Sequence, residues 1–271
     1  MMNLKYLAPS VSLSFAIIFS CAAVEPAPPA SSARDIASRL SAQQEGASYV
    51  RMLLEIKQPA DNKKIALQVQ IKERRTKTAA DVVYQVLWPK ERKGEAVLLH
   101  QTQGRSPTGA LLVPPDKPRP LTAAQMSDPL FGSNLAFQDV IEDFFAWENQ
   151  AIVGSEIVNS VNCVILESKP GKVDHSIYGS VRSWIDARRL VPLRVEKLLP
   201  SGKLARRIDT TRVAPDDRGR SIPANLAVQG GKDNSTTELD GSRIKHDVNY
   251  TDHDFSPDGL AETPAPQSPP K

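Results

Sequence analysis

The sequence predicts a mainly β protein with a few helices, built on one strongly curved antiparallel sheet. Residues 65–72 alternate strictly between apolar and polar types, which places branched apolar side chains on one face of a half-buried strand. Residues 82–88 repeat this period-two pattern. Short connections such as 200–203 and 215–219 contain Pro, Gly and Asp, so the strands that they join must pair antiparallel. We expect about ten or eleven strands in a single sheet.

The first 23 residues have the pattern of an export signal. Lys5 precedes a short apolar stretch that runs from Leu7 to Phe19, and small residues follow it. This order of a basic, an apolar and a small-residue region is typical of a signal peptide that is removed after export. Residues 24–34 are rich in Pro, Ala and Ser, which predicts a tether in front of the folded domain.

Two processing sites remain open within this signal. Residues 18–21 resemble a bacterial lipobox, in which Cys21 becomes the lipidated N-terminus of the mature chain. Cleavage after Ala23 would instead release a soluble periplasmic protein. The first alternative predicts an outer-membrane lipoprotein that faces the periplasm and touches the membrane surface through its lipid anchor.

The pattern of residues 35–256, the body of the chain, predicts one helix followed by a succession of short strands. Residues 33–44 have helical spacing of apolar residues. The remaining strand candidates are 49–58, 95–102, 108–114, 151–158, 161–168, 178–187, 191–199, 203–213, 222–229 and 236–250.

One stretch interrupts the strands, and the C-terminal end differs from the rest. Residues 114–120 contain four prolines and cannot form an interior strand. Residues 137–147 have amphipathic spacing, which predicts a helix with Asp139 as its N-cap and with Glu142 and Asp143 facing away from the core. The tail, residues 257–271, is proline-rich, and we expect it to be disordered.

Composition and motifs exclude several functions. The net charge of +3 is too small for a nucleic-acid-binding face, and the sequence has no phosphate-binding loop, zinc-protease motif or nucleophile elbow. Histidines such as His246 lack a recognisable metal-ligand spacing, and paired arginines such as Arg206 and Arg207 are expected on the outer face of the sheet. We therefore assign no catalytic residue, no metal ligand and no cofactor.

A family resemblance rests on three short motifs. The stretch from Leu130 to Val140 resembles a segment of the bacterial outer-membrane lipoprotein-sorting proteins with a LolA-like fold. Gly132, Ser133 and Asp139 match that segment, whereas Asn134 and Leu135 depart from it. Residues 184–203 are similar to a tryptophan-containing hairpin of the same family, and residues 255–260 are similar to its end. The resemblance spans roughly residues 35–260.

The resemblance implies a half-barrel sheet with helices over its concave face. It implies a non-catalytic carrier or acceptor of the cell envelope that shields the acyl chains of lipoproteins or lipids, because each exposed methylene costs about 0.8 kcal/mol in water. A sensor or binding module that recognises an envelope partner protein on the same scaffold is the alternative, and an envelope enzyme is a third. The residues expected to line the apolar cavity are Val69, Ile71, Tyr84, Trp88 and Phe144.

Overall fold

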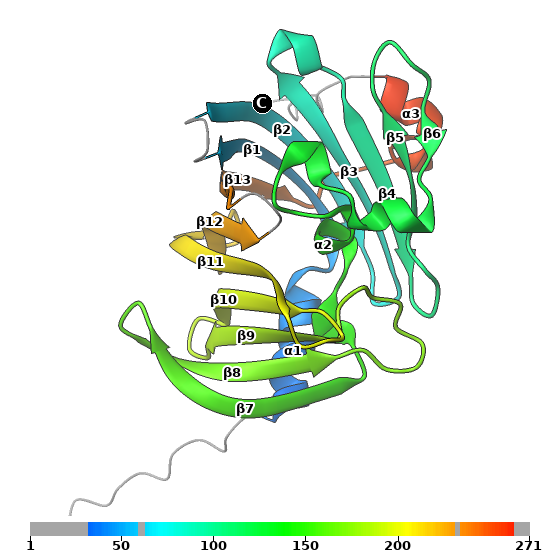
Figure 1. Ribbon diagram of the computed structural model, residues 1–271. Coiled ribbons are helices and arrows are strands. Elements are labelled where there is room, and N and C mark those ends of the chain that lie inside the picture. The colour runs from blue at the N-terminus through cyan, green and yellow to red at the C-terminus, as the bar shows by residue number, and fades with distance from the viewer. Residues whose placement is uncertain (1–31, 59–62, 231–233, 263–271) are drawn as a thin grey trace, which may run out of the picture. The chain divides into compact units, whose positions relative to one another are not determined.

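The computed structural model describes residues 32–58, 63–230 and 234–262 (Figure 1). They belong to one compact unit that starts at Ser31. The expected signal peptide, Cys21 and all but the last three residues of the expected tether lie outside the described residues. No helix in the described part of the chain is long and apolar enough to cross a membrane.

In the described residues, thirteen strands form a single antiparallel sheet that curves without closing. The strands are β1 Gly46–Gln58, β2 Lys63–Arg75, β3 Ala79–Trp88, β4 Ala96–Thr102, β5 Thr108–Leu112, β6 Arg119–Pro120, β7 Asn149–Val158, β8 Val161–Lys169, β9 Ser180–Asp186, β10 Val191–Leu198, β11 Leu204–Pro215, β12 Ser221–Gly230 and β13 Thr236–His246. The sequence predicts the curved antiparallel sheet correctly but undercounts its strands. One strand, β6, lies within the proline-rich stretch, where proline is compatible only with an edge position.

The helices are short, apart from the first. They are α1 Ala33–Gln43, η1 Lys90–Arg92, η2 Ala123–Ser127, η3 Leu130–Gly132, α2 Phe137–Ile141, η4 Phe144–Ala146, η5 Asp252–Phe255 and α3 Pro257–Ala261. The single helix predicted over 137–147 is wrong. Glu142 is extended, and the Asp143 side chain instead accepts a hydrogen bond from Phe145 N to cap η4.

The strand order explains why a segment crosses the sheet. The order is β6-β5-β4-β3-β2-β1-β13-β12-β11-β10-β9-β8-β7, so the first and last strands pair in the middle. Consecutive strands β6 and β7 consequently lie at opposite edges. The chain that joins them passes over the concave face, where Figure 1 shows α2. We call residues 121–141 the covering segment.

The largest core lies between the covering segment and one half of the sheet. Alternate residues of β1 to β4, together with Val228 of β12 and Leu239 of β13, face this core. The covering segment contributes six buried side chains, which are Met126, Leu130, Phe131, Leu135, Phe137 and Ile141. The four alternating residues of β2 that the sequence singles out, Ile65, Leu67, Val69 and Ile71, all face it.

The other half of the concave face is covered by α1 and η4. Ile36 and Leu40 of α1 pack with Phe145 of η4 against Leu166 and Ile185 of the sheet. Ser32 caps α1 by accepting a hydrogen bond from Asp35 N. The helices over the concave face, which the family resemblance implies, are thus present on both halves of the sheet.

The outer face of β3 to β5 is covered by the end of the described chain. Phe255 and Leu260 pack against Val83, Leu98 and Ala110. The expectation of a disordered tail from 257 onward is therefore wrong for residues 257–261, which form α3. The sequence pattern missed this helix because Ser256 and Pro257 act as its N-cap and first residue, while the prolines farther on dominate the composition. Residues 263–271 lie outside the described part.

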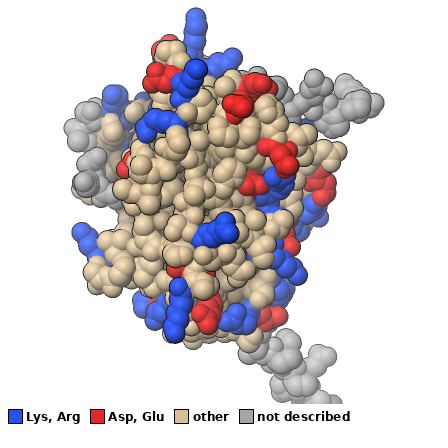
Figure 2. Space-filling view, turned by 90° about the vertical axis from the view of Figure 1, so that its right-hand side faces the viewer, with Lys and Arg blue, Asp and Glu red and all other residues tan. Residues whose placement is uncertain are grey.

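Figure 2 shows the side of the molecule that lies to the right in Figure 1, on which β4, β5 and β6 are found. Lysine, arginine and acidic side chains gather mainly around the periphery of this view. Few charged side chains occupy its middle. Uncharged surface of this kind is less costly to bury against another apolar surface than a charged one.

We predict that Leu260 is a structural residue of the domain. Leu260 is 2% exposed, so Leu260→Ala should lower the free energy of unfolding by about 2–5 kcal/mol through lost packing. Leu204→Ala is the matched control, because Leu204 is 47% exposed and should cost well under half as much. Equal midpoints in chemical denaturation for the two variants would show that α3 adds nothing to the core.

Candidate functional site

The covering segment is held from the sheet side by two arginines that bind its backbone. Arg75 at the end of β2 donates to the carbonyl oxygens of Ile141 at 2.9 Å and Val140 at 3.2 Å. Arg92 in η1 donates to the carbonyl oxygen of Phe131 at 3.3 Å and 3.4 Å. Both guanidinium groups also pair with acids of their own region, Glu73 and Glu95. The segment is thus attached through a few polar contacts on either side of its apolar core.

A third attachment involves Asn134, one of the two positions where the chain departs from the family motif. Its backbone N–H donates to Thr237 Oγ1 at 2.9 Å, and Thr237 Oγ1 donates to Asn134 Oδ1 at 2.7 Å. Its side-chain amide also donates to Ser235 and to the carbonyl of Gly230. Asn134 therefore fixes the turn of the covering segment to β12 and β13.

Asp139 of α2 forms the fourth attachment and is completely buried. Its Oδ1 accepts from Tyr178 Oη at 2.6 Å and from Lys197 Nζ at 2.9 Å. Its Oδ2 accepts from Ala136 N at 2.6 Å and from Arg206 Nε. Hydrogen bonds from this many donors replace the hydration that a carboxylate loses on burial, so the group stays ionised.

The electrostatics of Asp139 follow from these partners. Burial by itself raises the pKa of a carboxyl group, but Lys197 and Arg206, with the hydrogen bond from Tyr178, hold the pKa of Asp139 below its ordinary value. Lys197 also lies over the rings of Phe144 and Tyr178, at 5.4 Å and 5.0 Å from their centroids. The ion cluster therefore ties the covering segment to β10 and β11.

The residues expected to line an apolar cavity do not all lie together. Val69 and Ile71 are buried in the core beneath the covering segment, and Tyr84 packs against it. Trp88 is 53% exposed at the end of β3. Phe144 packs elsewhere, between α1 and the aromatic cluster of Trp147 and Tyr178. The first three residues share one apolar surface, and the other two are separate from it.

The motif residues shape the covering segment. Gly132 has φ +83°, a conformation that favours glycine, and Ser133 Oγ accepts a hydrogen bond from Leu135 N. The expectation that Asp139 is an N-cap is wrong, because Ala136 is the N-cap and Asp139 accepts the hydrogen bond from its N–H. The expected outer-face position of Arg206 is also wrong, since its side chain reaches Asp139.

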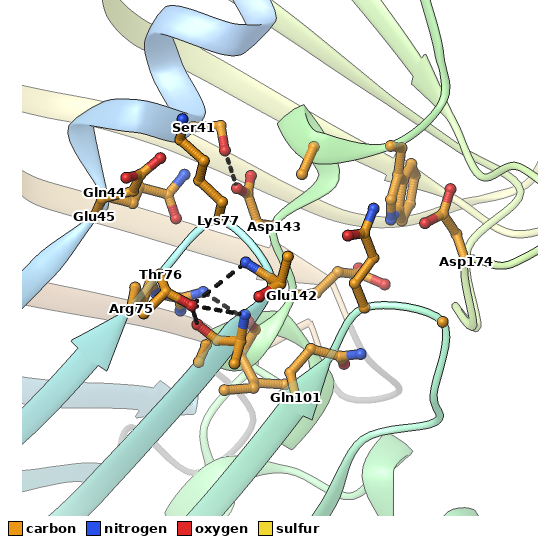
Figure 3. Close-up of a pocket in the computed structure, with 18 of the residues that line it drawn as sticks. Ser41, Gln44, Glu45, Arg75, Thr76, Lys77, Gln101, Glu142, Asp143 and Asp174 are labelled. Atoms are coloured by element: carbon orange, nitrogen blue, oxygen red, sulfur yellow. Dashed lines mark hydrogen bonds between the residues drawn. The ribbon is translucent and has the colours of Figure 1, made fainter.

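A pocket opens at one end of this core, where α1, the β2–β3 turn and the covering segment meet (Figure 3). Its volume is about 90 Å³. Polar and charged side chains provide much of its lining, so the open hollow differs from the apolar cavity that the sequence predicts. Its labelled lining residues in Figure 3 are Ser41, Gln44, Glu45, Arg75, Thr76, Lys77, Gln101, Glu142, Asp143 and Asp174.

Glu142 is the unusual member of this lining. Its Oε1 accepts from Gln138 Nε2 at 2.9 Å, but its buried Oε2 has no hydrogen-bond partner among the described residues. Burial raises the pKa of Glu142, and the charge of Lys197 with hydrogen bonds from Ser176 and Gln138 offsets this effect only in part. The expectation that Glu142 faces solvent from a helix is wrong, because the backbone turns away from the helical path at this residue.

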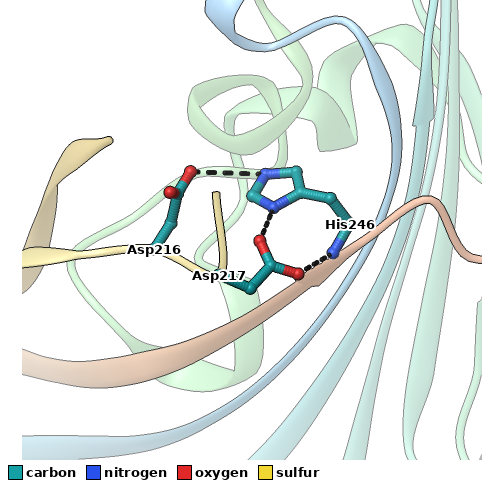
Figure 4. A group of neighbouring side chains, drawn as sticks. All are labelled: Asp216, Asp217 and His246. Carbon is teal, nitrogen blue, oxygen red and sulfur yellow. Dashed lines mark hydrogen bonds and ion pairs between the residues drawn. The ribbon is translucent and has the colours of Figure 1, made fainter. Parts of the chain in front are cut away.

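A second polar cluster could suggest a metal site but has a different explanation. Asp216, Asp217 and His246 converge at the end of β13 (Figure 4). His246 Nδ1 contacts Asp217, and Arg220 Nη2 lies 2.9 Å from His246 Nε2 while Arg220 Nε donates to Asp216 at 2.8 Å. The guanidinium of Arg220 thus occupies the side of the cluster where a cation would bind. We interpret the group as an ion-pair network.

Comparison with known proteins places the chain in a family. A protein-family model described as "Uncharacterized protein" matches residues 79–262, which is more than half of the chain. The chain belongs to this family. No curated protein matches the chain in sequence.

Solved structures similar to this member of the family confirm its fold. A DUF1329 family protein from Desulfovibrio piger superposes with a TM-score of 0.77 at 19% identity, covering 84% of this chain and 97% of that one. A domain from Vibrio parahaemolyticus, provisionally assigned to outer membrane lipoprotein sorting, gives 0.75 at 20% identity, with 84% and 98% covered. A LolA superfamily protein from Nitrosomonas europaea gives 0.67 at 17% identity, with 83% and 97% covered. The protein therefore has a LolA-like fold.

We predict that Asp139→Asn is strongly destabilising. The change leaves Lys197 and Arg206 buried without their counter-charge, so the free energy of unfolding should fall by about 3–5 kcal/mol near neutral pH. Asp240→Asn is the control, because its exposed pair with Arg212 should contribute less than about 1 kcal/mol. Chemical denaturation monitored by circular dichroism measures both.

The same pair of proteins tests the ionisation of Asp139. Because its pKa is lowered in the folded state, its contribution is fully present above the ordinary value of 3.8 and is lost as the pH falls below it. The stability difference between wild type and Asp139→Asn should therefore shrink below that pH. A difference that stays constant down to pH 2 would contradict the ion cluster.

Proposed function

We propose that the protein is a non-catalytic carrier or acceptor of the bacterial cell envelope. It shields acyl chains of lipoproteins or lipids between its sheet and the covering segment, and in this way takes part in outer-membrane lipoprotein sorting. One observation carries the proposal: the apolar concave face of β1 to β4 is closed by the covering segment, which polar contacts also hold in place.

The energetics support an exchange of the covering segment for lipid. Lifting the part of the segment before Asn134 would expose Met126, Leu130 and Phe131 and the sheet residues under them. Burial of each acyl methylene contributes about 0.8 kcal/mol, and burial of each apolar side chain contributes about 1.5–3 kcal/mol. Burying one acyl chain of ordinary length therefore offsets the exposure of several apolar side chains. The net cost of opening is then small when a lipid is present and large when it is absent.

The polar attachments set how readily the segment moves. The bonds from Arg75 and Arg92 reach backbone carbonyls, which can bind water after separation, whereas Asp139 keeps α2 fixed to β10 and β11. Arg75 binds carbonyls of α2 itself, so we propose that the segment opens on the Arg92 side, toward η1. The protein would thus open and close without losing its fold.

We predict that Arg92→Met accelerates uptake of acyl chains, whereas Arg75→Met does not, because Arg75 binds carbonyls of the fixed helix α2. Arg92→Met removes hydrogen bonds from a charged donor, which contribute about 1.5–3 kcal/mol, so association should quicken about tenfold or more. The measurement is stopped-flow fluorescence of a synthetic triacylated lipopeptide with an environment-sensitive dye. Arg212→Met is the control, since Arg212 is exposed and contacts Asn225 and Asp240.

Failure of wild type and both variants to bind the lipopeptide would refute the carrier function.

A sensor or binding module for an envelope partner protein is the alternative, and the edge strand β7 favours it. Ile152, Val153 and Ile157 are exposed there, and in the described part of the chain β7 pairs with β8 alone. An extended partner segment with apolar side chains could add a strand at this edge. Stoichiometric capture of such a partner without lipopeptide uptake would establish this alternative.

We propose that Cys21 is lipidated and that the protein is anchored in the outer membrane, with cleavage after Ala23 as the other outcome. The intact mass of the protein purified from a bacterial envelope distinguishes them, because acylation adds the mass of fatty acyl chains to a chain that begins at Cys21. Cys21→Ser should abolish that added mass and release the protein into the periplasm. An unchanged mass and location for Cys21→Ser would contradict anchoring.

A further inference from the structure

The polar pocket of Figure 3 has a lining that selects for positive charge. Four of its lining residues carry carboxylates and two carry cationic groups, with His175 in addition. One of the two cations, Arg75, is already committed to Glu73 and to the carbonyls of the covering segment. The other, Lys77, lies exposed in the β2–β3 turn. The inside of the pocket is therefore acidic.

One oxygen of Glu142 is a candidate acceptor for a hydrogen bond from a ligand. Glu142 lines the pocket, and its buried Oε2 has no donor within hydrogen-bond distance in the described structure, although hydrogen bonding from Ser176 and Gln138 to the carboxyl group partly offsets the rise in its pKa that burial causes. A buried acceptor without a partner is costly, and native proteins generally retain one only where something else supplies the donor. Two of the other three pocket carboxylates differ, since Asp143 accepts from Ser41 and Phe145, and Asp174 accepts from Gly171.

The geometry disfavours a metal ion as the missing partner. Within the described ranges, no three carboxylate or histidine side chains of this pocket lie close enough together to ligate one ion. A primary ammonium group suits the arrangement better, because it is a compact cation with three hydrogen-bond donors that point apart. The indole of Trp147 also lines the pocket, and aromatic faces attract ammonium groups.

The pocket is continuous with the apolar core beneath the covering segment. Ile141 and Ala80 line the pocket and are also members of that core. A molecule with its ammonium group beside Glu142 would consequently have its apolar part directed at the surface that β2 and β3 share with the covering segment. Lys77, at the exposed end of the lining, is suited to a phosphate next to the ammonium group.

We propose that this pocket binds the headgroup of an ethanolamine phospholipid, with Glu142 accepting a hydrogen bond from its ammonium group. The inference deepens the proposed carrier function and depends on it. It adds a headgroup preference to a site that would otherwise accept any acyl chain. The preference arises from hydrogen bonding, so a fully methylated ammonium group should be a poorer ligand.

The test compares headgroups that have identical chains. Isothermal titration calorimetry is run with monomeric dihexanoyl phosphatidylethanolamine, phosphatidylcholine and phosphatidylglycerol. The wild type should bind the ethanolamine lipid about tenfold more tightly than the other two. Glu142→Gln should remove this preference by weakening binding of the ethanolamine lipid. Glu238→Gln is the matched control, because Glu238 is exposed and pairs with Lys57 on the sheet.

The possible outcomes separate the two proposals. Equal binding of the three lipids by the wild type, or binding of none, overturns the headgroup inference, whereas the carrier function is decided separately by the lipopeptide experiment. A Glu142→Gln variant that folds and keeps the ethanolamine preference also overturns the inference. Competition by free phosphoethanolamine in the wild type needs no variant, and a failure to displace the ethanolamine lipid would likewise count against the site.

Discussion

The pairing of the first strand with the last is the constraint on which the other features depend. Once β1 and β13 lie side by side in the middle of the sheet, β6 and β7 must occupy its two edges. The chain between these edges has no route along the sheet and passes over the concave face. The cover of the apolar surface, the buried ion cluster and the polar pocket at its end all follow from that path.

The cover combines apolar contact with a small number of polar bonds, and each has a separate role. Apolar burial favours closure wherever water is the only competitor, because it is proportional to the area removed from solvent. The bonds made by Asn134 and Asp139 instead fix position, since each is satisfied by specific donors and acceptors. A lipid competes with the first kind of interaction and leaves the second intact.

Sequence patterns revealed the parts of the fold that depend on periodicity. The alternation of residues 65–72 identified the core face of β2, and the helical spacing after Ala33 identified α1 within one residue. The matched Gly132 and Ser133 located the turn of the covering segment. These features are local, and each side chain's neighbours along the chain determine them.

The candidate site was harder to predict because its contacts are distant in sequence. Asp139 meets Lys197 and Arg206, and nothing near any of the three marks the partnership. Strand alternation offers one signal, since Lys197 follows Val195 on the same face of β10 and so faces inward. Trp88 shows the opposite error, because its position in the alternating pattern predicts burial while the end of its strand leaves it exposed.

The central pairing also bears on how the polypeptide acquires its fold. Ribosomes make β1 near the start of synthesis and β13 near the finish, so one edge of β1 stays unsatisfied until almost the entire domain has been produced. Such long-range pairing slows folding, and unpaired strand edges that can aggregate stay exposed until it is complete. A chain that lacks β13 therefore leaves one edge of β1 unpaired and is prone to aggregate through it.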